Sequence, residues 1–79
     1  MATKVVNLPS YVEALNKSGL KNRSNHDYYS CLSAEIYNIE DDKVTFRNYM
    51  TDIEYYEYAF VRHGKGNVEF IYVTYGVDI

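Results

Sequence analysis

The sequence predicts an α+β fold in which one short N-terminal helix packs on a four-stranded antiparallel β-meander. A helix start signal and a helix stop signal bracket residues 10–19. From about residue 28 to residue 76, large apolar or aromatic residues alternate with polar ones, which is the period of β-strands. Short polar segments interrupt the alternation three times. Four strands joined by hairpins therefore follow the helix.

The length and composition predict a single small globular domain spanning residues 1–79. Apolar residues make up 47% of the chain, which argues against disorder. The chain has no apolar run long enough to cross a membrane, and its first residues, MATKVVNLPS, lack the apolar core of a signal peptide. Cys31 is the only cysteine, so an internal disulfide is excluded. We therefore expect a cytoplasmic protein.

The N-terminal helix has signals at both ends. Ser10 and Glu13 form an S-x-x-E pattern, which predicts a capping box that satisfies free backbone N–H groups at the helix start. Gly19 fits the left-handed position just beyond the last helical turn. Leu20 would then contact Leu15. Such a short helix is marginal alone, so we expect it to lie on the sheet.

The rest of the chain divides into a loop and four strands. Residues 21–27 are polar and predict the loop. In the first strand the alternation places Leu32, Ala34 and Ile36 on one face. The strands are expected at about residues 28–39, 43–49, 53–62 and 68–75.

The last hairpin has two registers. A three-residue loop, Gly64–Gly66, with a bulge would pair Phe60 with Phe70, Tyr58 with Tyr72, and Tyr55 with Tyr75. A two-residue turn would slip the pairing by one residue and turn one strand over. The three-residue loop is favoured because it pairs aromatic residues across the strands, but the sequence leaves both registers open.

The charge distribution is lopsided. Residues 1–26 carry four Lys or Arg against one acid, whereas residues 27–79 carry ten acids against four Lys or Arg. An acidic sheet disfavours a nucleic-acid partner, because phosphate binding depends on basic side chains. It permits a basic protein partner, since complementary charge steers association. Plain solubility is the alternative explanation.

Tyrosine is concentrated in the predicted sheet, where residues 49–75 hold six of the chain's ten. Both faces of the last two strands read as largely apolar, yet one short helix covers only part of one face. A patch of exposed rings is typical of an interaction surface, and tyrosine suits such a surface because it is rigid and amphipathic. High β-propensity and core bulk are the alternative reasons for these tyrosines. The expected partner-binding residues are Tyr49, Asp52, Glu54, Tyr55, Tyr56, Glu57, Tyr58 and Tyr75.

No catalytic, metal or cofactor motif stands out. His26, Asp27 and Cys31 are close in sequence, but a strand cysteine is more often a small buried side chain and a loop histidine is more often solvated. The histidines and the cysteine lack the spacing of a zinc site. We therefore expect no enzyme activity, no metal and no cofactor. Aromatic strands can also stack nucleobases, but few basic residues surround these rings.

In general character the chain resembles the small inhibitors that phages and other mobile elements encode against host enzymes, including anti-CRISPR and DNA-mimic proteins. The likeness lies in composition: about 80 residues, acidic and rich in tyrosine, with no recognisable active site. It implies a viral protein that works in the host cytoplasm. Its partner would be a host protein, such as a nucleic-acid-processing complex, whose basic surface it occludes. A homo-oligomer such as a homodimer, paired through its sheet edges or faces, and a weak single-stranded nucleic-acid binder are the alternatives.

Overall fold

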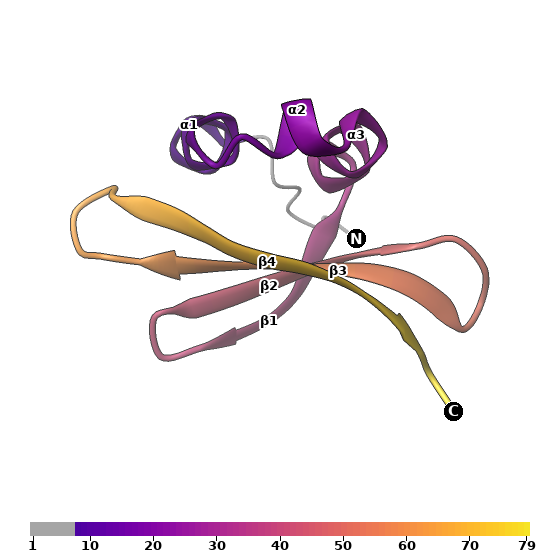
Figure 1. Cartoon of the computed structure of the whole chain (residues 1–79). Helices are drawn as coiled ribbons and strands as arrows, with labels where there is room; N and C mark the ends of the chain where they lie inside the picture. The colour runs from indigo at the N-terminus through magenta and orange to yellow at the C-terminus, as the bar shows by residue number, and fades with distance from the viewer. Residues whose placement is uncertain (1–7) are drawn as a thin grey trace.

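The structure is a computed structural model that describes residues 8–79. These residues form two layers (Figure 1): three short helices lie over one face of a four-stranded antiparallel sheet, and no helix of this range covers the other face. The predicted α+β class and the four-stranded meander are confirmed. Residues 1–7, in which no signal peptide was expected, lie outside the described range.

The first helix, α1 (Pro9–Lys17), begins differently from the sequence prediction. Pro9 occupies its first turn, where a fixed φ is favourable and no N–H is needed. Leu8 is the N-cap and no side chain caps the helix, so the predicted capping box between Ser10 and Glu13 is not formed. The predicted helix stop is confirmed, because Gly19 has a φ of 78°.

Two further helices, α2 (Leu20–Arg23) and α3 (Asn25–Leu32), replace the predicted loop and the first half of the predicted first strand. The Ser24 hydroxyl caps α3 by accepting a hydrogen bond from the Asp27 N–H at 3.2 Å. Tyr28 and Cys31, one turn apart, are both buried on the inner face of α3. Residues 28–32 were therefore wrongly predicted as strand, although the predicted burial of Cys31 is confirmed.

The strands run in the order β1-β2-β3-β4 along the sheet. Asp41, at a φ of 54°, and Asp42 form the tight turn between the first two. At the opposite end of the sheet, the turn between the second and third strands includes Thr51. The four strands are β1 (Glu35–Glu40), β2 (Lys43–Tyr49), β3 (Glu54–Arg62) and β4 (Val68–Val77).

The loop between β3 and β4 has the favoured three-residue form. The His63 N–H donates to the Asn67 carbonyl at 2.7 Å, and Gly64 and Gly66 have φ values of 85° and 74°. Phe60 faces Phe70, as predicted.

Beyond that pair the predicted register is wrong by one residue. Ile71 is the extra residue of a β-bulge, because Phe60 pairs with Phe70 while Ala59 pairs with Tyr72. Consequently Tyr58 faces Val73 rather than Tyr72. Tyr55 similarly faces Gly76 rather than Tyr75.

The core lies between the helices and the sheet. Tyr11 of α1 packs edge-on against Phe46 and Phe60, with ring centroids 5.4 and 5.1 Å away. The Tyr58 hydroxyl reaches α3 and donates to the Ser30 hydroxyl at 2.6 Å. Burying each large side chain stabilises the fold by about 1.5–3 kcal/mol, so these contacts hold the two layers together. None of the helices within residues 8–79 has the length and apolar run needed to cross a membrane.

Candidate functional site

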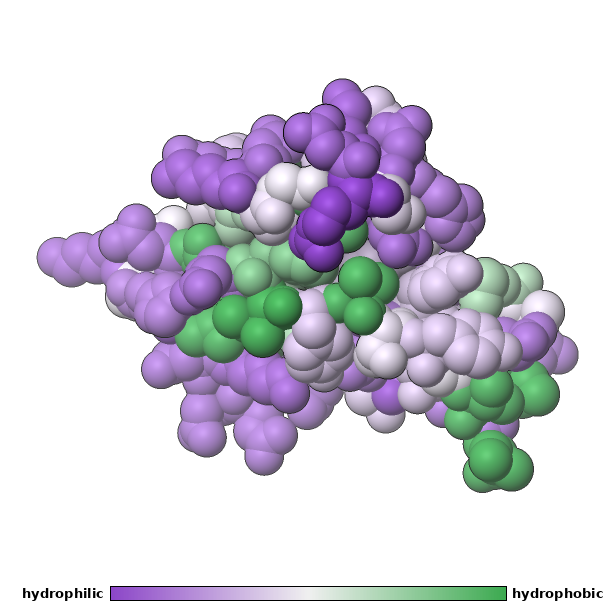
Figure 2. Space-filling model, in the orientation of Figure 1, coloured by the Kyte–Doolittle hydropathy of each residue, from purple (hydrophilic) through white to green (hydrophobic). Residues whose placement is uncertain are grey.

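Exposed apolar side chains gather at one end of the sheet, where the β2–β3 turn lies beside the last residues of β4. Figure 2 shows strongly hydrophobic residues at the end that carries the C-terminus, below the polar helices. We call residues 49–54 and 75–78 the hairpin end. Five of its apolar side chains are between 39 and 52% exposed: Tyr49, Met50, Ile53, Tyr75 and Val77.

The hairpin end is held by short-range hydrogen bonds. The Met50 N–H donates to the Glu54 carbonyl, and the Thr51 hydroxyl accepts from the Glu54 N–H at 3.0 Å. The Asp78 N–H donates to the Ile53 carbonyl at 2.8 Å, which fixes the end of β4 against the turn. The exposed apolar groups therefore stand on an ordered backbone.

Two of the exposed rings are tied to carboxylates. The Tyr75 hydroxyl donates to Glu54 at 2.8 Å, and the Tyr49 hydroxyl donates to Asp78 at 2.7 Å. These hydrogen bonds raise the pKa of both phenols, so both rings are neutral donors near pH 7. Rings fixed in this way lose less conformational freedom when a partner covers them.

The charge of the hairpin end is negative. Neither residues 48–61 nor residues 66–79 contain a lysine or an arginine. Asp52, Glu54 and Asp78 supply carboxylates around the exposed apolar groups. The nearest cation in sequence is Arg47, and its charge is engaged within the protein.

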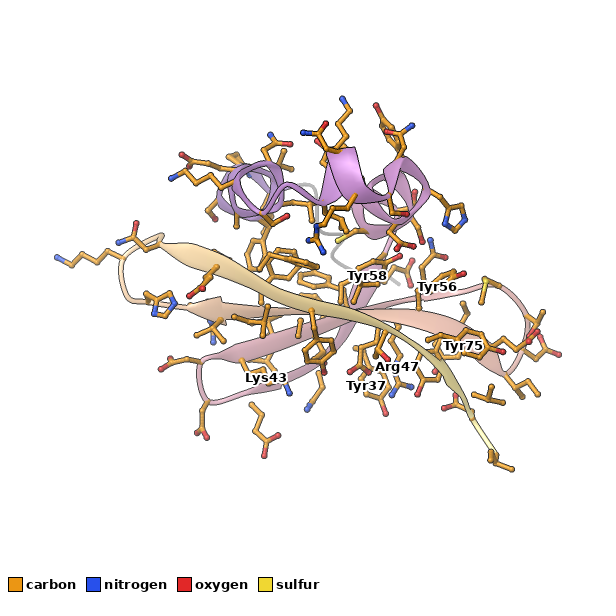
Figure 3. The ribbon with its side chains drawn as sticks, viewed as in Figure 1. Tyr37, Lys43, Arg47, Tyr56, Tyr58 and Tyr75 are labelled. Carbon is orange, nitrogen blue, oxygen red and sulfur yellow. The ribbon has the colours of Figure 1, made fainter. Side chains whose placement is uncertain are left out.

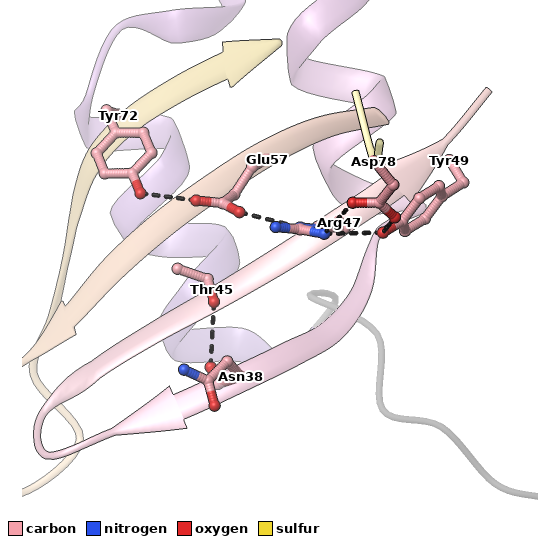
Figure 4. A network of polar contacts seen from close by, with 7 residues as sticks. All are labelled: Asn38, Thr45, Arg47, Tyr49, Glu57, Tyr72 and Asp78. Carbon is pink, nitrogen blue, oxygen red and sulfur yellow. Dashed lines mark hydrogen bonds and ion pairs between the residues drawn. The ribbon is translucent and has the colours of Figure 1, made fainter. Parts of the chain in front are cut away.

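Arg47 is the centre of a polar network on the helix-free face (Figure 4). Its Nε donates to Glu57 at 3.0 Å, and one terminal nitrogen contacts the Tyr49 hydroxyl at 2.8 Å and Asp78 at 3.4 Å. Glu57 also accepts from the Tyr72 hydroxyl at 2.8 Å. The Arg47 side chain is only 12% exposed. Burial by itself lowers the pKa of Arg47, but the hydrogen bonds with Tyr49 and Glu57 hold it above its ordinary value.

Aromatic rings enclose the same guanidinium. Its carbon lies 3.5 Å from the ring centroid of Tyr37 and 3.8 Å from that of Tyr55, so the two rings cover opposite sides of the planar group. Figure 3 shows Arg47 and Tyr37 together on the helix-free side. The Tyr55 ring in turn lies over Gly76, which has no side chain to displace it. One residue from each strand thus joins a row across the sheet.

The structure separates the eight predicted site residues into three groups. Tyr49, Asp52 and Tyr75 are exposed at the hairpin end, and Glu54 is half-buried beside Tyr75. Tyr58 is 0% exposed, packed beneath α3, so it is a core residue and its inclusion in a binding surface is corrected. The remaining three residues, Tyr55, Tyr56 and Glu57, are half-buried and contact other side chains of the protein.

Several residues of this region were not predicted. Strand alternation in residues 43–49 puts Arg47 on the same face as Tyr49, but nothing in the local sequence indicates that its side chain is enclosed. The exposed Met50, Ile53 and Val77 were missed because a turn and a strand end have no regular alternation. Hydrophobic residues in or beside a predicted turn are the signal that could have identified them.

The residues considered for chemistry are not assembled into a reactive site. Burial raises the pKa of the Cys31 thiol to about 12, which leaves it protonated and unreactive near neutral pH. His26 and Asp27 contact each other at 3.4 Å on the surface. Within residues 8–79, no group of His, Cys, Asp and Glu side chains is placed to hold a metal ion.

The class that fold and site define is a small α+β protein with an apolar, acidic end to its sheet. No family model matches this chain, and neither a curated protein nor a solved structure matches it.

Proposed function

We propose that this chain is a non-enzymatic protein-binding module that docks the hairpin end on a basic surface of a partner protein. The observation that carries the proposal is the cluster of exposed, ordered apolar side chains ringed by Asp52, Glu54 and Asp78. An apolar centre with a charged rim is the usual anatomy of a protein interface. The acidic rim favours a basic partner through electrostatic steering.

Docking of the hairpin end would prevent the partner from binding nucleic acid. A basic surface large enough to hold nucleic acid would be blocked by an acidic, tyrosine-bearing sheet end, both sterically and by charge. This occlusion is the mechanism implied by the resemblance to phage and mobile-element inhibitors of the anti-CRISPR or anti-defence kind. The partner would then be a host nucleic-acid-processing protein, and the chain would act in the host cytoplasm.

The helix-free face supports protein rather than nucleic acid as the partner. Its central cation, Arg47, already has Glu57 and Asp78 as ion-pair partners. A phosphate would have to displace these carboxylates from a side chain that is 12% exposed. The aromatic rings around Arg47 therefore lack the free positive charge that base-stacking surfaces use.

A matched pair of isoleucines tests the proposed surface. Ile53 at the hairpin end and Ile71 at the β4 bulge are 50% and 47% exposed. A partner recovered from host lysate with the tagged parent chain should bind Ile71→Ala normally, whereas Ile53→Ala or Tyr75→Ala should each weaken binding by at least about tenfold, because central interface side chains carry most of the affinity. Asp52→Lys should slow association most at low salt.

Competition separates binding from occlusion. If the proposal is correct, the parent chain should displace nucleic acid from the partner, and Ile53→Ala should do so at a correspondingly higher concentration. A partner that binds its nucleic acid and this chain at the same time would overturn occlusion alone. Equal affinity of the parent and every folded hairpin-end variant would overturn the binding surface itself.

A further inference from the structure

Among residues 8–79, β4 is an edge strand that pairs on one side only. It spans Val68–Val77 and pairs with β3, and it ends the strand order of the sheet (Figure 1). Its first half is partly covered, because α1 contacts β4 and residues of α1 line a hollow with Val68 and Phe70. The bulge at Ile71 also interrupts regular pairing there. The second half, residues 73–77, contains no bulge and no residue that lines this hollow; we call it the free segment.

The hydrogen-bond directions on β3 show which groups of β4 are free. In an antiparallel pair, residues whose N–H and C=O point toward one neighbour alternate with residues that point to the other side. The Glu54 carbonyl accepts from Met50, and the Arg62 N–H donates to the Asp42 carbonyl, so even-numbered residues of β3 point toward β2. Its odd-numbered residues therefore point toward β4.

Those odd-numbered residues, from Tyr55 to Ala59, are paired with Gly76, Thr74 and Tyr72. The N–H of Asp78 also points inward, since it donates to Ile53. By alternation, Val73, Tyr75 and Val77 point their backbone N–H and C=O groups away from the sheet. Natural edge strands are usually protected by charge, proline or a bulge, and the free segment contains none of these.

We infer that a second copy of this chain pairs with the free segment in antiparallel orientation, about a twofold axis at Tyr75, and joins the two sheets into one. In an antiparallel pair, the two residues opposite each other must both point their N–H and C=O groups toward the other strand, or both point them away. A twofold axis between two copies of one strand therefore passes through a residue that lies opposite its own copy. Centring the axis on Tyr75 places Val73 opposite Val77 of the other copy. Each outward N–H and C=O of these residues then has a partner.

The side chains of the free segment fit their own copy. Val73 and Tyr75 are opposite Tyr58 and Tyr56, so they lie on the helix-side face together with Val77. The twofold pairing would set valine beside valine and Tyr75 beside Tyr75 on the helix-side face. The segment carries no charge, so like charges do not oppose each other and a basic foreign strand would gain no attraction from it.

Charge-swap variants test the twofold axis. All of them carry Glu54→Gln as a background substitution. Glu54 accepts a hydrogen bond from Tyr75 and would form an ion pair with a lysine introduced at position 75. The parent and Glu54→Gln should sediment at twice the 9.3 kDa chain mass. Glu54→Gln/Tyr75→Lys and Glu54→Gln/Tyr75→Glu should each be monomers, because like charges meet at the axis, and their equimolar mixture should form the dimer.

Amide hydrogen exchange gives a second readout without a variant or a binding partner, so it also separates this inference from the proposed function. The N–H groups of Val73, Tyr75 and Val77 should become protected as the concentration rises, while that of the exposed Ile71 should not. A parent chain that remains monomeric at millimolar concentration would overturn the inference. A dimer that the charge-swap mixture fails to restore, or in which these three amides stay unprotected, would overturn it equally.

Discussion

Arg47 determines the character of the helix-free face. Its guanidinium lies between two tyrosine rings and contacts two carboxylates. Removing one member of such an ion-pair network destabilises the fold, because the remaining charged side chains lose their partner. The contacts of Arg47 therefore stabilise the sheet, whereas the proposed partner surface lies at the hairpin end.

Gly76 is required by the ring of Tyr55. A Cβ at position 76 would overlap the outer atoms of that ring, while the backbone of Gly76 is not left-handed. Gly76→Ala should therefore lower the free energy of unfolding by about 1–3 kcal/mol through overpacking. Urea unfolding followed by circular dichroism measures the change.

The cause can be isolated with a double-variant cycle. In a Tyr55→Ala background the ring is gone, so Gly76→Ala should then cost far less than in the parent. Thr74→Ala is the control, because Thr74 lies on the same face of β4, two residues before Gly76. It measures the cost of placing alanine, which favours helix, in this strand. An equal cost of Gly76→Ala in both backgrounds would show that the ring is not responsible.

At the scale of the helices, alanine substitution of two serines should have different effects on stability. Ser24→Ala removes the hydroxyl that accepts from Asp27 at the start of α3 and should lower the free energy of unfolding by roughly 0.5–2 kcal/mol. Ser10→Ala should change it by less than about 0.5 kcal/mol, because Ser10 lies inside α1 and caps nothing. Thermal unfolding of both variants tests this, and a larger loss for Ser10→Ala would restore the capping box predicted from sequence.

The same two serines show why one helix was predicted and another missed. Ser24 and Asp27 have the spacing of a cap, as Ser10 and Glu13 do, but the tyrosines that follow favour strand by propensity. Packing decided the outcome, because a helical turn brings Tyr28 and Cys31 onto one buried face. Propensity is a weak guide where tertiary contacts compete with it.

The strands were better predicted than the helices, up to the bulge. Alternation located β2, β3 and β4 to within two residues, but it did not identify their buried faces, because both faces of the last two strands read as largely apolar. The glycines at 64 and 66 identified the three-residue loop. The bulge at Ile71 has no sequence signature, since Ile71 itself is an ordinary strand residue. That one insertion moved every pairing from the start of β3 to Ala59 by one residue.

For the molecule as a whole, the sequence predicted the acidic, tyrosine-rich character of the hairpin end but not its extent. Tyr49, Asp52 and Tyr75 are exposed, because strand ends and turns are accessible in any meander, and their role in binding stays a prediction. Tyr58 was included wrongly, since the sequence implied one helix and the structure has three over that face. How much of a sheet is covered depends on packing between distant segments, which local patterns do not contain.

Alkaline pH should destabilise the whole fold through buried acids that are neutral. Burial raises the pKa of Cys31 from 9.0 to about 12, and burial together with the hydrogen bond to Glu57 raises that of Tyr72 from 10.0 to about 12. The folded state therefore holds these protons more tightly than the unfolded chain does. The resulting stability is complete below about pH 8 and is lost as the pH rises from there through these raised pKa values, by up to about 1.4 kcal/mol per pH unit for each group.

Urea unfolding in steps from pH 8 to about pH 11 measures this loss and assigns it. The slope of the unfolding free energy between pH 8 and pH 9 should belong chiefly to the thiol, because an unfolded thiol with a pKa of 9.0 is already partly ionised there, whereas an unfolded tyrosine with a pKa of 10.0 is almost entirely protonated. Cys31→Ala should therefore flatten that interval, although it lowers stability at every pH by truncating a buried side chain. Tyr72→Phe should leave that interval unchanged and reduce the slope above pH 10. A parent chain whose stability is constant up to pH 11 would show that these groups titrate as freely in the fold as in the unfolded chain.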